Sequence, residues 1–283
     1  MIINQKKQTT KFMRTAESKC LLCNRNLAIQ KNSHIIPKFM TKSILGIENQ
    51  KSIYLVSSSI ARKSPIVSQD TAKEDFILCE GCENYFSVLE TYIAKRLSNL
   101  KNVKYSNQFP AFEDQGCVIG KVCEGINPII FRLFLYSILW RCSISSTQLC
   151  TGFSLNTDEE EELRTTLLSF KSENQLHLLN NIEQSTATFP YLPFVLFTAD
   201  SFIDKSSNIL FTKPNSKNPY MIFLNEYILL ISFKYNEAHK KFEYLNNIDE
   251  SKIKIGYFPN DYWNGLLQNF FQIVANKTDI KRT

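Results

Sequence analysis

The sequence predicts a mixed α+β fold with a small cysteine-rich unit at its N-terminus, and three observations lead to it. Two Cys-x-x-Cys pairs occur within the first 82 residues. Apolar residues then recur at helical spacing, and runs rich in Tyr, Ile and Phe nearer the C-terminus have the composition of strands. We expect a basic arm over residues 1–18, the cysteine-rich module over residues 19–105, and a helical and then α+β region over residues 106–283.

The two cysteine pairs have the spacing of a metal site. Cys20/Cys23 and Cys79/Cys82 are each separated by two residues, which lets both thiolates of a pair reach one ion. Gly81 suits the tight turn inside the second pair. Four thiolates complete a tetrahedral zinc site and leave no open position, so the predicted zinc is structural. The 55 residues between the pairs exceed the gap of a compact zinc finger.

The composition excludes several classes of protein. The first residues are polar and basic, without the apolar core of a signal peptide, so a secreted disulfide scaffold is not expected. The most apolar run, residues 128–140, is shorter than the roughly 20 residues of a membrane span, and Arg132 interrupts it. Cys142 lies in an apolar stretch and is expected in the core. We therefore expect a cytoplasmic protein that does not bind membranes.

The charge is unevenly distributed along the chain. Residues 1–110 hold 17 Lys and Arg against 8 Asp and Glu, a net charge of +9, whereas the remainder holds 16 against 19, a net charge of −3. The half that carries the cysteine pairs is thus the basic half. This predicts a polyanionic partner such as nucleic acid, with Lys38, Arg62 and Lys63 as candidate contacts. Ordinary solubilising charge is the alternative interpretation.

The elements of the module are expected in a definite order. A short strand should end near His34, and Pro37 breaks it. Residues 52–57 and 76–78 are predicted as further strands. After Cys82, apolar residues at spacings of three and four predict a helix; they are Phe86, Leu89, Ile93, Leu97 and Leu100. Each Cys-x-x-Cys pair is expected to form a zinc knuckle. The expected order is the first knuckle, the strands, the second knuckle and the helix, which is the order of a treble-clef, or ββα-metal, unit.

The remaining two thirds are predicted as helices followed by strands. A helix over 127–143 has Asn127 as N-cap and Pro128 at its first position. A second over 157–180 begins at Thr157 or Asp158, and its glutamates, Glu159 to Glu162, suit the positive helix end better than a metal site. Strands are expected over 191–198, 220–224, 227–233 and 252–258, with a hairpin turn at 225–226, and a last helix over 261–275.

The element Ser33-His34-Ile35-Ile36-Pro37 is the candidate for chemistry. The imidazole of His34 is neutral or nearly so at physiological pH and is suited to act as a general base. A structural histidine or a stray zinc ligand is the alternative. The residues alone favour that alternative.

A family resemblance changes this balance. Cys-x-x-Cys, then His-Ile-Ile-Pro on a strand, then Leu78-Cys79-x-x-Cys82 opening a helix resembles the HNH endonuclease superfamily in its zinc-stabilised form. Residues 20–100 carry this likeness. More narrowly, Ser-His-Ile-Ile-Pro-Lys-Phe, Leu-Cys-Glu-Gly-Cys-Glu-Asn-Tyr-Phe and Ser-Ile-Leu-Trp-Arg, ending at Arg141, resemble uncharacterised bacterial HNH-like proteins. Such proteins are often associated with phage defence or mobile elements.

The resemblance implies a hydrolase that cleaves phosphodiester bonds with one metal ion. His34 would activate water, and a magnesium or manganese ion would stabilise the phosphate charge. The residue before the histidine and a residue on the following helix hold that ion in the family. Ser33 and either Glu83 or Asn84 match those positions, and Glu90 lies two turns after Glu83 on nearly the same face.

The sequence also departs from the family. Ser33 stands where an acidic ligand is usual, and the helical histidine is absent; a neutral hydroxyl is a weak ligand for magnesium. Either the glutamates supply the charge, with Asp70 or Asp75 from the preceding loop, or only the zinc scaffold remains. We therefore carry two hypotheses: an HNH-type nuclease, and a non-catalytic zinc module that binds nucleic acid or protein. In the nuclease hypothesis, the C-terminal region is expected to bind a partner or select the substrate.

A cysteine-based redox protein is a weaker third hypothesis. Two paired knuckles without a thioredoxin-like βαβ context argue against it.

Overall fold

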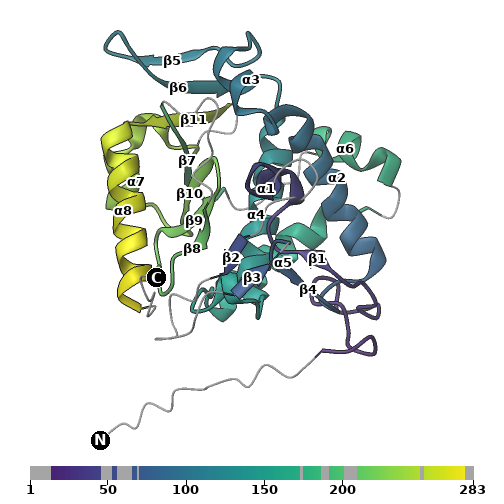
Figure 1. The fold of residues 1–283 in the computed structure, drawn as a ribbon. Helices are drawn as coiled ribbons and strands as arrows, with labels where there is room; N and C mark the ends of the chain where they lie inside the picture. Colours follow the sequence, from purple (N-terminus) through teal and green to yellow (C-terminus); the bar gives the residue numbers. More distant parts are fainter. Residues whose placement is uncertain are drawn as a thin grey trace, which may run out of the picture.

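The structure is a computed structural model, and part of the chain lies outside the residues that it describes. It describes residues 14–45, 53–55, 66–68, 70–172, 175–185, 191–200, 209–248 and 252–277. Most of the predicted basic arm and the predicted nucleic-acid contacts Arg62 and Lys63 lie outside this set. The described residues form a mixed α+β fold, in which a helical layer and a large mixed sheet lie side by side (Figure 1).

The N-terminal part is built from short elements. They are β1 (Ser33–His34), α1 (Lys38–Leu45), β2 (Ile53–Leu55), β3 (Ile66–Ser68) and β4 (Lys73–Glu74). Strand β1 pairs antiparallel with β4, with His34 opposite Lys73, and β2 pairs with β3. The predicted strand over 76–78 is wrong. Phe76 has a positive φ of 59°, so the chain bends there, and the peptide groups of Ile77 and Leu78 bond instead to the first knuckle region.

Helix α2 (Glu80–Leu97) confirms the helix predicted after the second knuckle, but it starts earlier, since Cys79 is its N-cap residue and Cys82 lies in its first turn. Its predicted apolar stripe is buried as far as Leu97. Leu100 belongs to a separate helix, α3 (Leu100–Tyr105), because Asn99 interrupts the pattern and caps the new helix through its side chain.

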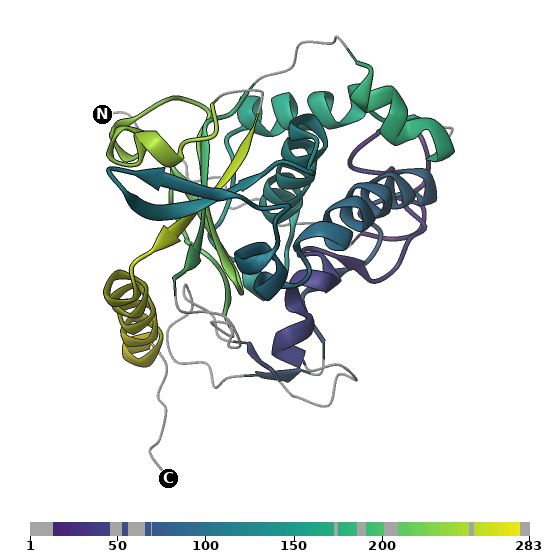
Figure 2. The same cartoon turned by 90° about the horizontal axis from the view of Figure 1, so that it is seen from above.

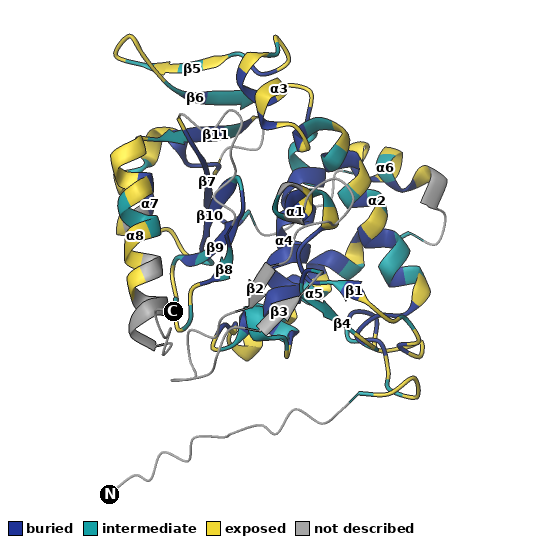
Figure 3. Ribbon diagram, in the orientation of Figure 1, coloured by how far each residue is buried: buried dark blue, intermediate teal, exposed yellow. Residues whose placement is uncertain are grey.

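Helix α4 (Pro128–Ile144) forms the centre of the molecule. Asn127 caps it by accepting hydrogen bonds from the amides of Ile129 and Ile130, as predicted. Nearly all of its side chains are buried, because α2, α5 and α6 pack around it and the sheet covers it on the other side. It is coloured almost wholly as buried in Figure 3. None of the helices in the described part of the chain is long and apolar enough to cross a membrane.

The helix predicted over 157–180 is two helices, α5 (Thr157–Ser169) and α6 (Gln175–Glu183). The N-cap is Asn156 rather than Thr157 or Asp158. Asn156 and Glu159 bond to each other's backbone amides in a capping box. Glu160 accepts a hydrogen bond from Ser143, and Glu161 pairs with Arg164, so these two glutamates and Glu159 have local partners.

The C-terminal part is a seven-stranded sheet in the order β5-β6-β11-β7-β10-β9-β8. Its strands are β5 (Ala111–Asp114), β6 (Cys117–Cys123), β7 (Phe194–Ala199), β8 (Leu210–Thr212), β9 (Tyr220–Leu224), β10 (Tyr227–Ile231) and β11 (Ile253–Phe258). Only β7 and β11 pair in parallel. The predicted β9–β10 hairpin is confirmed, whereas β5, β6 and β8 were not predicted.

Helices flank the sheet on both faces. Phe194 of β7 stacks on Phe131 of α4 at a centroid distance of 6.0 Å on the helical side. On the other side lie α7 (Glu237–Lys241) and α8 (Asn260–Lys277), whose Trp263 is buried against the strands (Figure 2). Two short 3-10 turns, Gln148–Cys150 and Glu243–Leu245, complete the fold.

The predicted boundary at residue 105 does not separate two apolar cores. One continuous cluster runs from Cys20 and Leu22 beside the knuckles, through α2 and α4, to Ile253 and Ile255 in the sheet. The cysteine-rich module is therefore packed into the rest of the chain.

Candidate metal and catalytic site

The four predicted zinc ligands lie together. The Sγ atoms of Cys20, Cys23, Cys79 and Cys82 all lie within 4.8 Å of one another, and all four side chains are buried. The first pair comes from the turn before β1 and the second from the start of α2. Four buried thiols at this spacing could hold a metal ion such as zinc. They are the only group of three or more potential metal ligands among the described residues.

The electrostatics of this cluster favour one thiolate, at Cys20, and oppose ionisation of Cys79 and Cys82. A hydrogen bond from Cys82 lowers the pKa of Cys20 to about 5, with backbone amides adding to the effect. The hydrogen bond to Cys20 and burial raise the pKa of Cys82 in turn. One buried negative charge is thus already stabilised by its neighbours, and a bound cation would supply the charge that lets the remaining thiols ionise.

Two side chains outside the four ligands support the knuckles. Asn26 Nδ2 lies 3.9 Å from Cys79 Sγ. Arg164, on α5, donates from Nη1 to the carbonyl of Leu22 at 2.7 Å, so a helix 142 residues away fixes the first turn.

Ser33 and Glu83, two predicted ligands of the catalytic metal, are in direct contact. Ser33 Oγ donates to Glu83 Oε2 at 2.7 Å, and the serine is 1% exposed. Glu83 follows Cys82 directly, in the first turn of α2. The cysteine cluster therefore fixes the end of the helix from which Glu83 reaches strand β1.

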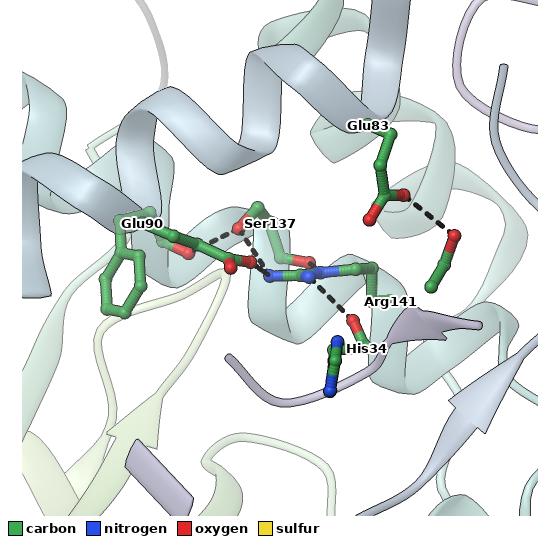
Figure 4. Close-up of polar contacts among 7 residues, drawn as sticks. His34, Glu83, Glu90, Ser137 and Arg141 are labelled. Atoms are coloured by element: carbon green, nitrogen blue, oxygen red, sulfur yellow. Dashed lines mark hydrogen bonds and ion pairs between the residues drawn. The ribbon is translucent and has the colours of Figure 1, made fainter. Parts of the chain in front are cut away.

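His34 is half-buried, and its ring points away from Glu83 and from Arg141 (Figure 4). Burial lowers the pKa of this imidazole, and the positive charges of Lys73, Arg141 and Lys38 act in the same direction against the opposing charge of Asp70. The ring is therefore neutral at physiological pH. Its Nε2 is enclosed, and within the described residues it has no hydrogen-bond partner.

The carbonyl of His34 is held by a buried arginine. Arg141 Nη1 donates to that carbonyl at 2.7 Å, and Nη2 lies 2.7 Å from Glu90 Oε1 in an ion pair (Figure 4). Nε bonds to the carbonyl of Ser137, one turn earlier on α4, and the guanidinium lies 5.2 Å from the Phe86 ring centroid. One side chain on α4 thereby connects β1 with α2.

Glu90 was predicted to assist the metal, and the structure places its carboxylate on Arg141 instead. Burial raises the pKa of Glu90, and Arg141 opposes that change. The contact is an ion pair rather than a well-directed hydrogen bond. Glu90 therefore neutralises a buried cation.

The other predicted ligands are distributed over separate places. Asn84 lines a groove of about 500 Å³ between α2 and α6, together with Lys95 and Arg96. Asp70 is paired with Lys73, beside His34. Asp75 accepts a hydrogen bond from the amide of Asn32 at 2.7 Å. The structure thus joins Ser33 to Glu83, while the contacts that it shows for Asn84 and Asp75 are with other residues.

Sequence reasoning missed Arg141 as a site residue. It ended the Ser-Ile-Leu-Trp-Arg element, to which no function was attached. The available signal was a positive charge inside an otherwise apolar helix, because a buried cation requires partners. Lys73 was also missed, and only its pairing opposite His34 reveals it.

Comparison with protein-family models, with curated proteins and with solved structures found no significant match to this chain.

Proposed function

We propose that this protein is a metal-dependent HNH-type nuclease that hydrolyses phosphodiester bonds, with DNA as the preferred substrate. One observation carries the proposal: the residue before His34 meets a carboxylate of the following helix, with 2.7 Å between Ser33 Oγ and Glu83 Oε2. The resemblance of residues 20–100 to HNH nucleases led us to expect a catalytic ion held from these two positions.

The arrangement of elements supports the same proposal. The cysteine turn is followed by the antiparallel pair of β1 and β4 and then by α2, which starts at the second cysteine pair. This is the order expected for a zinc-stabilised ββα-metal unit. We assign a structural zinc ion to the four cysteines.

The side-chain oxygens of Ser33 and Glu83 are candidate ligands for a magnesium or manganese ion. Magnesium usually binds proteins through one or two carboxylates and takes its remaining ligands from water and substrate phosphate. Glu83 supplies one carboxylate and Ser33 one hydroxyl oxygen. An ion bound there would stabilise the negative charge of the phosphate during attack.

The residues around His34 have complementary roles. Its neutral imidazole accepts a proton from the attacking water. Since Nε2 is enclosed, Nδ1 is the nitrogen assigned to this step. Lys38 and Lys73, both close enough to lower the pKa of His34, attract the phosphate backbone. A role in phage defence or a mobile element is proposed from the resemblance alone.

Cleavage of plasmid and single-stranded DNA with Mg²⁺ or Mn²⁺ tests the proposal. His34→Ala should reduce the rate about 10²- to 10⁴-fold, as expected for loss of a general base. Glu83→Gln should raise the metal concentration needed for half-maximal rate. His177→Ala, an exposed histidine on α6, is the matched control and should leave the rate unchanged. Equal rates for His34→Ala and wild type would refute the role of His34.

The second candidate function is a non-catalytic zinc module that binds nucleic acid. The ring of His34 turns away from Glu83, and the described residues hold no second cluster of metal ligands; both observations favour it. It predicts DNA binding that weakens steeply with salt, one zinc ion per chain, and no turnover with any divalent ion.

A further inference from the structure

A second pocket lies far from His34 in the fold, at the edge where β11 meets α7 and α8. It has a volume of about 330 Å³, large enough for one nucleotide, and its lining is dominated by aromatic rings. The lining residues are Ile119, Phe197, Lys241, Phe242, Tyr244, Leu245, Tyr257, Phe258, Pro259 and Tyr262. Figure 1 shows these elements on the opposite side of the sheet from β1 and α2.

The floor of the pocket is closely packed. Phe197 is buried and stands edge-on to both Phe242 and Phe258, with centroid distances of 4.9 Å to each. Gly256 lies behind it: a Cβ at this position would come within 2.5 Å of Leu245 and 3.0 Å of Phe197. The absence of a side chain at Gly256 therefore lets the floor close without filling the pocket.

The rim offers two exposed tyrosines. Tyr244 is 60% exposed and Tyr262 is 67% exposed, which is unusual for large apolar rings that line a common cavity. Tyr262 packs against Phe258 in an edge-to-face arrangement with 6.0 Å between ring centroids, so its ring has a partner in the pocket wall. Flat, exposed and supported rings of this kind suit stacking of a planar ligand.

The charge of the residues that line the pocket indicates the charge of its ligand. Lys241 is the one charged residue that lines the pocket, and among the described residues it has no ion-pair partner, although its neighbour Lys240 is paired with Glu237. Among the described residues that line the pocket there is no carboxylate, and the one charge is positive, which disfavours a cationic ligand. A planar ring that carries a negative charge fits both features.

We propose that this pocket binds an unpaired nucleobase together with its phosphate. The base stacks on the tyrosines of the rim, and Lys241 pairs with the phosphate. The ligand is either a free mononucleotide or a nucleotide of a single strand, since the two present the same chemistry. The inference goes beyond the proposed nuclease and stands on residues that take no part in it.

This inference is tested by equilibrium binding without divalent ions, because the proposed nuclease does not cleave the probes under those conditions. The probes are dAMP, an oligo-dT 12-mer, an abasic 12-mer of equal charge, and inorganic phosphate. We expect Tyr262→Ala to weaken binding of dAMP or of the dT 12-mer about 5- to 150-fold, the range of one lost stacking contact. Lys241→Ala should weaken binding of both nucleotides, whereas Tyr105→Ala, a tyrosine of similar exposure outside the lining, should not.

The probes separate the two sources of the ligand. If dAMP binds and the dT 12-mer does not, the ligand is a free nucleotide. If the dT 12-mer binds and its abasic form binds weakly, the ligand is a nucleotide of a single strand. Either result supports the pocket. Equal affinity for the dT and abasic 12-mers, or unchanged nucleotide affinity in Tyr262→Ala with an unchanged melting temperature, overturns it. A cleavage defect in His34→Ala is measured separately, so failure of either proposal is distinguishable from failure of the other.

Discussion

Two clusters fix helix α2 to the rest of the molecule, and they do so by different physical means. At its first turn, Cys79 and Cys82 meet the cysteines of the first knuckle, in a closed site whose members are all buried thiols. Two turns further along, Glu90 meets Arg141, which also holds the carbonyl of His34. The first cluster brings two segments together at four thiols that could share one metal ion, whereas the second joins β1, α2 and α4 through one side chain.

The two clusters should therefore contribute differently to folding and to the position of strand β1. A structural zinc ion brings its binding free energy to folding, so the cysteine cluster should decide whether the module folds. A buried ion pair loses much of its attraction to desolvation and adds little net stability, but removing one partner leaves an unpaired charge. The Arg141 cluster should therefore decide where β1 and His34 lie. The predictions below test this division.

Loss of the cysteine cluster should have the largest effect. Cys79→Ser removes one ligand from the proposed zinc site. In small zinc-finger peptides, structural zinc contributes a binding free energy of roughly 10–16 kcal/mol. We therefore expect the variant to lose most of the bound zinc and the native melting transition. Metal analysis and thermal unfolding with and without a chelator measure both. Cys117→Ser, at an exposed cysteine outside the cluster, is the control and should match wild type. Full zinc content in Cys79→Ser would contradict the assignment.

The Arg141 cluster should give the next largest effect. Arg141→Met leaves the Glu90 carboxylate buried without its cation, which costs about 3–5 kcal/mol in the free energy of unfolding. Adding Glu90→Leu should restore most of that loss, because an apolar pair of similar size replaces the ion pair. Urea unfolding of both single variants and the double variant measures the coupling.

The same double variant tests whether Arg141 positions strand β1, which carries His34. With stability restored, the cleavage rate expected of the proposed nuclease should remain low, because the hydrogen bond from Arg141 to the His34 carbonyl is lost. Lys240→Met, which breaks an exposed ion pair with Glu237, is the control and should leave stability close to that of wild type. If the double variant recovers both stability and rate, the role of Arg141 is structural only.

The same two clusters show what the sequence could predict. The cysteine site was predictable because its signal is local: a gap of two residues, occurring twice. The caps and turns that rest on neighbouring residues were equally accessible, as at Asn127 in α4 and at the β9–β10 turn. Arg141 and His34 are 107 residues apart, and no spacing rule connects them. Their contact depends on how α4 packs against β1.

The missed elements have related causes. The strand predicted over 76–78 failed because Phe76 has a positive φ, which turns the chain there, and a phenylalanine gives no signal of such a turn. The β5–β6 hairpin was overlooked although its turn, Gln115-Gly116, carries a glycine at positive φ, a recognised turn signal. For the candidate catalytic site, the resemblance predicted Ser33 and Glu83 as ligands of one ion, and the structure shows a direct hydrogen bond between them; the partner of Glu90 was not predicted.

The smallest of these effects should come from the arginine that supports the knuckle. Arg164→Ala removes the hydrogen bond to the Leu22 carbonyl, and a bond from a charged donor contributes about 1.5–3 kcal/mol. We expect lower stability and faster loss of zinc to a chelator. Glu161→Gln is the matched control: it removes only the largely exposed partner of Arg164 and should cost less than about 1 kcal/mol. Faster zinc loss in Arg164→Ala alone would show that the cysteine cluster, closed in its ligands, still depends on α5 for its shape. Equal zinc loss in both variants would show that its four thiols and their ion are sufficient.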